Sequence, residues 1–213
     1  TEKYTATGCA VISQTEITCV TAPGVGKDLR WSVTVGAQVS TVFTSDTTAY
    51  VVPEVTDLSG DAVISPSITE GGSEIVITGD YFGPLDTDDS DIVVKYGPLS
   101  EQDRYTATSC SMVSAQTKII CSTAPGVGAN HKWHVQIGLQ HSNVLGSKTT
   151  KYIVPSINGL SGDAMAASGT TTYGGAAISI SGTNFGPSSH TEVAAQYGPP
   201  GSTEKYTATG CAV

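Results

Sequence analysis

The stretch GGSEIVITGDYFGP, residues 71–84, decides how the fold of this chain is interpreted. Ile75 and Ile77 lie two residues apart, a spacing that puts their side chains on one face of a β-strand. Glycines and a proline, which are typical turn residues, stand before and after this apolar centre. The stretch therefore predicts a short, half-buried β-strand between two turns.

Similar alternating stretches occur throughout residues 53–154, at 74–78, 91–96, 104–108, 117–121, 132–137 and 148–153. Six or seven short strands in about 100 residues, without helical periodicity, predict an all-β immunoglobulin-like sandwich. A tryptophan can be a platform for a ligand, but the alternation of Trp133 with Val135 favours the core. Trp31 is expected to be a core residue of its own segment. The expected inward positions are Ile75, Ile77, Val93, Tyr105, Ile119, Trp133, Val135 and Ile153.

The chain also repeats itself. YTATGC at residues 4–9 returns as YTATSC at 105–110 and as YTATGC at 206–211, each time after 101 residues. TAPGVG at 21–26 likewise returns at 123–128. Such repetition is typical of arrays in which each module contacts its neighbours. The sequence predicts modules of about 101 residues each.

The two kinds of module are not identical. All eleven letters of TEKYTATGCAV, residues 1–11, recur at 203–213, which gives a period of 202 residues. One module away, only five of these eleven letters agree. We expect a repeat of two diverged modules, type A and type B, of which the chain shows one period and a short overlap. A protein that happens to stop at this point is the alternative.

Several motifs together resemble the IPT/TIG domain, which has an immunoglobulin-like fold. They are GGSEIVITGDYFGP, VKYG at 94–97, a cysteine pair, STAPGVG at 122–128 and the pattern W-x-V-x-I-G from Trp133. The resemblance covers the whole chain and implies that certain glycines serve turn conformations. These glycines are Gly79 and Gly83, with Gly182 and Gly186 as their counterparts.

The IPT/TIG family occurs in cell-surface receptors, in DNA-binding transcription factors and in long extracellular repeat proteins. The first and third groups fit a tandem array, and the basic loops of the transcription-factor branch are absent from this sequence. By the resemblance, residues 53–154 form one complete module of type A. Residues 1–52 are the later part of a type B module, and residues 155–213 are the early part of the next one.

A half sandwich exposes its apolar face and its unpaired strand edges, and is therefore unstable alone. Either the polypeptide continues in both directions, or separate chains complete each other head to tail by adding strands. Both arrangements give a linear filament, because a head-to-tail contact that does not close is open-ended. The expected partner of the chain is therefore another copy of itself.

The five cysteines fit this division. Cys9 and Cys19 are expected to form one disulfide and Cys110 and Cys121 another, each between neighbouring strands, and Cys211 is expected to pair outside the segment. Paired cysteines in small β modules indicate an extracellular setting. Reduced buried cysteines are the alternative, and the absence of C-x-x-C argues against zinc.

Charge and hydropathy exclude two classes of partner. Against 19 Asp and Glu stand 10 Lys and Arg, a net charge of −9, which argues against nucleic acid. No stretch approaches the roughly 20 apolar residues of a membrane helix. We expect neither nucleic-acid binding nor membrane insertion, and no cofactor.

Metal sites are not expected. The acidic loop residues Asp86, Asp88, Asp89 and Asp91 are a weak calcium candidate, because calcium favours clustered carboxylates, but a solvated loop is the stronger interpretation. His131 and His134 differ by an odd number, so on a strand they face opposite sides, which argues against a metal site with His141. No catalytic motif is present either: GVGK at 24–27 lacks the first Gly and the Ser/Thr of a phosphate loop. We expect no enzyme, and interpret TAPGVG as a turn between strands.

Ser/Thr-rich stretches are candidates for O-linked sugars, with plain solvated loops as an equal alternative. The positions are Thr41, Thr44, Thr47, Thr48, Ser142, Ser147, Thr149 and Thr150. The sequence as a whole favours a structural subunit of an extracellular filament or surface appendage. The alternative is an adhesin or receptor ectodomain that binds a glycan or a protein through its loops.

Overall fold

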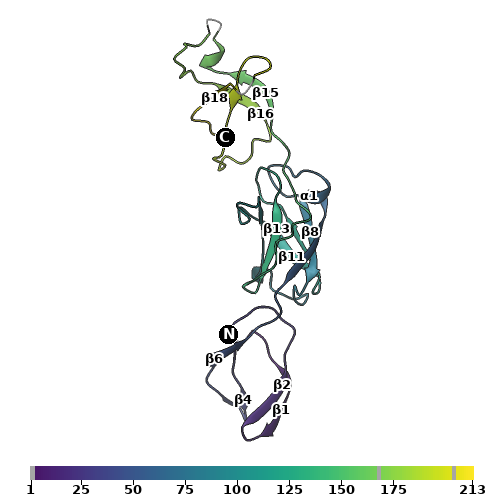
Figure 1. The fold of residues 1–213 in the computed structure, drawn as a ribbon. Helices are drawn as coiled ribbons and strands as arrows, with labels where there is room; N and C mark the ends of the chain where they lie inside the picture. Colours follow the sequence, from purple (N-terminus) through teal and green to yellow (C-terminus); the bar gives the residue numbers. More distant parts are fainter. Residues whose placement is uncertain (1–2, 167–168, 203–204) are drawn as a thin grey trace.

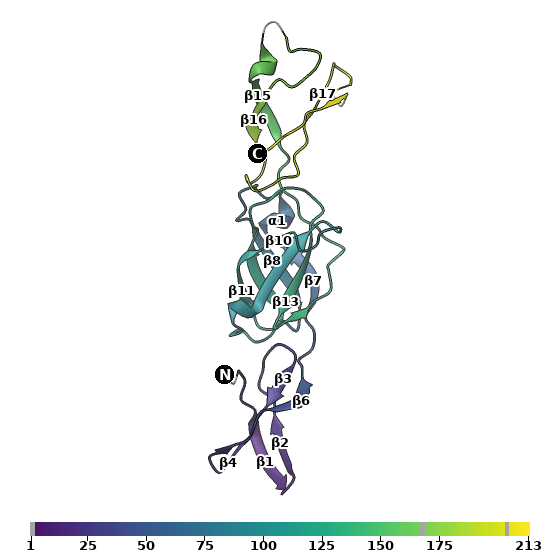
Figure 2. The same cartoon turned by 90° about the vertical axis from the view of Figure 1, so that its left-hand side faces the viewer.

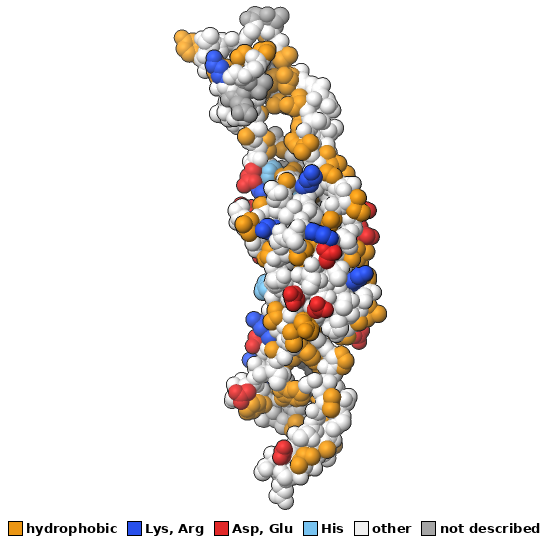
Figure 3. Space-filling model, turned by 45° about the vertical axis from the view of Figure 1, so that its right-hand side comes forward, with side chains coloured by type: hydrophobic (Ala, Val, Ile, Leu, Met, Phe, Trp, Pro, Cys, Tyr) orange, Lys and Arg blue, Asp and Glu red, His pale blue; other side chains and the backbone are white. Residues whose placement is uncertain are grey.

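The computed structural model describes residues 3–166, 169–202 and 205–213. Three parts follow one another along a line: a small N-terminal part, a sandwich in the middle and a small C-terminal part (Figures 1 and 2). Together they form a rod, and hydrophobic side chains reach the surface near both of its ends (Figure 3).

The middle part is an immunoglobulin-like sandwich of two four-stranded antiparallel sheets. One sheet has the strand order β11–β12–β8–β7 and the other β10–β9–β13–β14. A single turn of helix, α1 (Asp61–Ile64), follows β7, and a 3-10 turn, η1 (Asp89–Asp91), precedes β9. The strands are β7 (Glu54–Ser59), β8 (Glu74–Asp80), β9 (Ile92–Gly97), β10 (Tyr105–Thr106), β11 (Thr108–Ser114), β12 (Lys118–Ser122), β13 (Lys132–Ile137) and β14 (Gln140–His141). The chain is therefore mainly β, as predicted.

The core of the sandwich lies between these two sheets. Trp133 is fully buried and stacks on Tyr96, with ring centroids 3.9 Å apart. Its indole N–H donates to the Thr150 hydroxyl at 3.0 Å, so the polar atom of the ring is satisfied in the interior. Four other expected core residues are also buried: Ile75, Ile77, Ile119 and Val135.

Two expected core positions are wrong by one residue. Val94 is fully buried whereas Val93 is only half-buried, because β9 turns Ile92, Val94 and Tyr96 toward the core. The expected strand at 148–153 forms only isolated bridges, in which Tyr152 pairs with Ser67. Tyr152 is the buried residue there, and its neighbour Ile153 is half-buried.

The N-terminal part contains three two-stranded sheets and no four-stranded one in the described residues. Trp31 is only half-buried, so the expectation of a core position is not met in this chain. Val11 is 65% exposed, although its counterpart in the middle sandwich, Met112, is buried. The strands are β1 (Thr7–Ser13), β2 (Glu16–Val20), β3 (Leu29–Trp31), β4 (Thr34–Val35), β5 (Gln38–Val39) and β6 (Phe43–Thr48).

The C-terminal part has two small antiparallel sheets, β15–β16 and β17–β18. Its apolar residues are also open to solvent, with Ile157 at 64% and Leu160 at 50% exposure. The elements are β15 (Ser156–Ser161), the 3-10 turn η2 (Asp163–Met165), β16 (Ser179–Thr183), β17 (Gln196–Tyr197) and β18 (Tyr206–Thr207).

Candidate functional site at the two junctions

The first junction joins the N-terminal part to the sandwich through Val25 and Gly83. Val25 lies in the connection between β2 and β3, outside the sandwich, yet it is only 6% exposed. A Cβ added at Gly83 would overlap the Cγ1 atom of Val25, so the valine fills a space that only glycine leaves open. The φ of Gly83 is +103°, which also favours glycine.

Three further contacts close this junction. Gly26 and Gly138 approach each other closely, because a Cβ on Gly138 would lie 2.6 Å from the Cα of Gly26. The Gln140 side-chain amide donates to the backbone oxygen of Tyr50 at 3.0 Å. Lys3 forms an ion pair with Asp91 at the end of η1. The junction therefore combines a close backbone fit with one charged contact.

The second junction joins the sandwich to the C-terminal part in the same way. Val127 occupies the place of Val25, and a Cβ added at Gly186 would overlap its Cγ1 atom. Gly186 has a φ of +96°, close to that of Gly83. Arg104 forms an ion pair with Glu192. Each member of this pair lies 101 residues after its counterpart in the first junction, Lys3 or Asp91.

Tyrosine hydroxyls fix the two loops that carry the valines. The Tyr4 hydroxyl bonds both the backbone N–H and the backbone oxygen of Val25, each at 3.0 Å. The Tyr105 hydroxyl makes the same two contacts with Val127, at 3.1 and 2.9 Å. Because the loops are held from within their own part, the valines are positioned before the next part packs on them.

Electrostatics at the junctions orient more than they stabilise. The Arg104 guanidinium, hydrogen-bonded to Glu192, holds the pKa of that carboxyl below its usual range. Glu192 is 62% exposed, and solvent-exposed pairs contribute at most about 1 kcal/mol. The fit of valine against glycine therefore contributes most of the contact, and the ion pair favours one rotation of the parts about the axis.

The sequence did not reveal this interface. TAPGVG does connect two strands, but its valine is an interface residue in both copies. The signal that could have indicated the interface is that these six residues are identical in two modules whose surrounding sequences differ. Gly79 was expected to serve a turn and lies instead within β8, where an added Cβ would overlap the backbone oxygen of Glu54. Gly182, in β16, has the same close contact with the backbone oxygen of Ser156 in β15.

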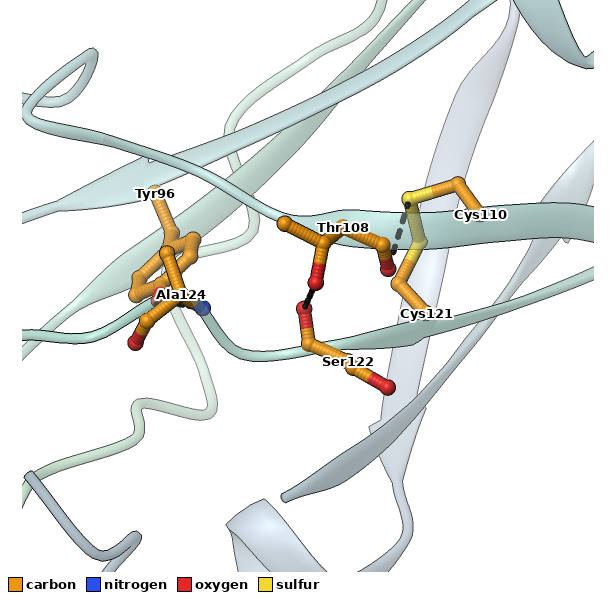
Figure 4. Close-up of a disulfide and its surroundings, with 6 residues drawn as sticks. All are labelled: Tyr96, Thr108, Cys110, Cys121, Ser122 and Ala124. Atoms are coloured by element: carbon orange, nitrogen blue, oxygen red, sulfur yellow. Dashed lines mark hydrogen bonds between the residues drawn. A yellow bond between two sulfur atoms is a disulfide. The ribbon is translucent and has the colours of Figure 1, made fainter. Parts of the chain in front are cut away.

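Both expected disulfides are present in the structure. Cys110 and Cys121 link β11 to β12, beside the hydrogen bond from Thr108 to the backbone oxygen of Ser122 (Figure 4). Cys9 and Cys19 link β1 to β2 in the same way. Cys211 is the free cysteine of the described part of the chain, so its expected pairing outside the segment stays a prediction.

The other sequence candidates do not gather into a site. Among the described residues, no three His, Cys, Asp or Glu side chains lie where they could hold a metal ion. In the acidic loop, Asp88 caps η1 by accepting from the Ser90 N–H at 2.8 Å, and Asp91 pairs with Lys3. Asp86 and Asp89 are exposed.

The sugar-attachment candidates differ in exposure. Thr150 is wrong as a candidate, because it is 4% exposed and its hydroxyl accepts from Trp133. The other seven stay predictions: Ser142 is half-buried, and the rest are exposed, namely Thr41, Thr44, Thr47, Thr48, Ser147 and Thr149.

The comparisons with known proteins agree with the fold. A family model described as the IPT/TIG domain matches residues 62–152, which lie within the middle sandwich. No curated protein is similar enough to the chain to be matched.

Proposed function

We propose, from the IPT/TIG domain that this chain contains at residues 62–152, that the protein is a structural subunit of an extracellular filament or surface appendage. IPT/TIG domains are non-catalytic immunoglobulin-like modules involved in adhesion or protein interaction. In this proposal the interaction is with further copies of the same module, stacked end to end.

The repeated junction carries the proposal. The contact of Val25 with Gly83 recurs one module later with the same residue types, and the ion pair of Lys3 with Asp91 recurs with the same charges, as Arg104 with Glu192. A contact that relates each module to the next by the same rotation and translation, without closing on itself, generates a linear array. A module that bound its ligand through loops at one end would have no need of matched contacts at both ends.

An extracellular location is consistent with two observations. The two disulfides and the IPT/TIG domain fit an extracellular protein. In the described residues there is no helix long and apolar enough to cross a membrane.

Electron microscopy of the native material tests the proposal. We expect unbranched filaments with an axial repeat of two modules, because type A and type B modules alternate. A denaturing gel of the same material, with and without reductant, then separates a continuous polypeptide from 21.8 kDa chains held together by contacts. Native material consisting of dispersed single particles without an axial repeat would refute the filament.

A further inference from the structure

We infer that the exposed apolar face of the N-terminal part binds strands β15, β16 and β17 of a second copy of this chain, and that the two together complete one sandwich. The inference rests on the proposed function and adds to it the docking surface, its occupant and the register of the strands. The middle sandwich supplies the template, because strands β1–β5 and β15–β18 of the two end parts have counterparts in it.

The accepting face is formed by β1 and β2. In their hairpin, Val11 lies opposite Ile17, as Met112 lies opposite Ile119 in the β11–β12 hairpin. Met112 and Ile119 are buried in the middle sandwich, whereas Val11 is 65% and Ile17 38% exposed. The same hairpin therefore has a covered inner face in one part of the molecule and an open one in the other.

The strands that would cover this face are present at the other end of the rod. β15 pairs with β16 so that Leu160 lies opposite Ile180, as Leu58 lies opposite Ile77 in β7 and β8. Leu58 and Ile77 are fully buried, and Leu160 is 50% exposed. The C-terminal part thus holds the half of the sandwich that the N-terminal part lacks.

The template sets the register of the new pairing. β12 pairs with β8 with Ile119 opposite Ile77, so Ile17 is expected opposite Ile180 of the second copy. The other sheet gives a second, independent pair. Trp133 lies opposite Tyr96 and stacks on it at 3.9 Å, so Trp31 is expected to stack on Tyr197 of the second copy.

The two faces cannot meet within one molecule. The N-terminal and C-terminal parts lie at opposite ends of the rod with the whole middle sandwich between them (Figures 1 and 2). None of these 213 residues can therefore cover the face from within the same rod, and a second copy of them is the occupant in this proposal. Since each copy carries one accepting and one donating end, docking continues along the rod axis.

One segment of the chain competes with this docking. Tyr206 in β18 pairs with Tyr197 as Tyr105 pairs with Tyr96 in the middle sandwich. In the completed sandwich the place of Tyr105 belongs to Tyr4 of the accepting copy. The Cys9–Cys19 disulfide ties the segment that follows Tyr4 to β2, whereas β18 is followed by the free Cys211. On docking, β18 is therefore the segment that leaves.

Sedimentation velocity of the 213-residue chain over a range of concentrations tests the inference. Val11→Asp places a carboxylate on the inner face of β1, and Ile12→Asp places one on the outer face, next to it in sequence. Both residues are exposed in the single chain, at 65% and 59%, so neither substitution disturbs its folding. Val113, the counterpart of Ile12, is 50% exposed in the middle sandwich and shows that this position stays outside.

We expect the unchanged chain and Ile12→Asp to form concentration-dependent oligomers, and Val11→Asp to remain monomeric. Trp31 fluorescence should shift to the blue on association, with Trp133→Phe used to isolate its signal. A chain that stays monomeric at all concentrations, or oligomers that Val11→Asp leaves intact, would overturn the docking. Neither result would conflict with the observation of filaments in native material. Failure of the docking is therefore distinguishable from failure of the proposed function.

A truncation after residue 204 tests the competition. Without β18 the donating strands are free from the start, so the apparent dissociation constant should fall several-fold. An unchanged or weaker association would show that β18 does not occupy the docking position. Val11→Asp introduced into the truncated chain should again give a monomer, because it disrupts the accepting face.

Discussion

At the scale of single residues, His131 shows how completely the sandwich excludes water. The ring is 1% exposed and makes edge contacts with Tyr96, Tyr105 and Tyr152 at centroid distances between 5.4 and 5.8 Å. Its Nδ1 atom has no hydrogen-bond partner in the described residues. Burial, with a smaller effect of Arg104, lowers the pKa of His131 to about 4. The side chain is therefore neutral in the folded protein at neutral pH.

This buried histidine predicts a loss of stability in acid. In the unfolded chain the pKa of histidine is about 6.5, so between pH 6.5 and 4 the unfolded state binds a proton that the folded state does not. The free energy of unfolding should fall as the pH is lowered through this window, by up to about 3 kcal/mol. Urea denaturation followed by Trp133 fluorescence measures it.

His131→Leu should reduce this pH dependence, because leucine cannot be protonated. The part that remains belongs to other groups such as His134, whose pKa is also lowered by burial. His141→Gln, at an exposed position, is the matched control and should keep it. The same dependence in the wild type and in His131→Leu would show that His131 is not its source.

At the scale of elements, the β11–β12 hairpin depends on its disulfide. Cys110 and Cys121 close a loop with a sequence separation of 11 residues. Loop-closure entropy for a loop of this length corresponds to about 2–3 kcal/mol. The double variant Cys110→Ser, Cys121→Ser should lose this amount in denaturant unfolding, whereas Cys211→Ser should lose nothing. Equal midpoints for all three proteins would contradict a stabilising role for the bond.

The strands themselves could largely be predicted from the sequence, because alternation of apolar residues is a local signal. Where two apolar residues are adjacent, as at Val93 and Val94, alternation cannot say which one faces the core. The register of β9 against β13 decides which of the two valines is buried, and this register depends on the partner strand as well as on β9. For the same reason the role of Val25 could not be predicted, since the glycine that receives it lies 58 residues away, at Gly83.

At the scale of the whole molecule, the straightness of the rod depends on the two valines at the junctions. Val25→Asp replaces a 6% exposed side chain and removes about 1.5–3 kcal/mol of apolar burial. The aspartate also has to be desolvated against the backbone of Gly83, so the junction should open and the N-terminal part should move independently.

Small-angle X-ray scattering of the monomeric chain measures this change. We expect a distance distribution shifted toward shorter distances and a smaller radius of gyration for Val25→Asp than for the unchanged chain. Val42→Asp adds the same charge at a residue that is 57% exposed, and should leave the rod straight. If both variants scattered alike, the junction would not depend on Val25.

The disulfide of the middle sandwich has a consequence when the rod is pulled. Tension enters the sandwich at one end and leaves at the other, because the neighbouring parts attach at opposite ends (Figure 1). When such a module yields, its chain lengthens by about 3.3–3.6 Å for every residue released. The residues between Cys110 and Cys121, with a separation of 11, cannot be released while the bond holds, which shortens the extension by roughly 35 Å. The redox state of this one bond thus sets the maximum length to which the middle sandwich can be stretched.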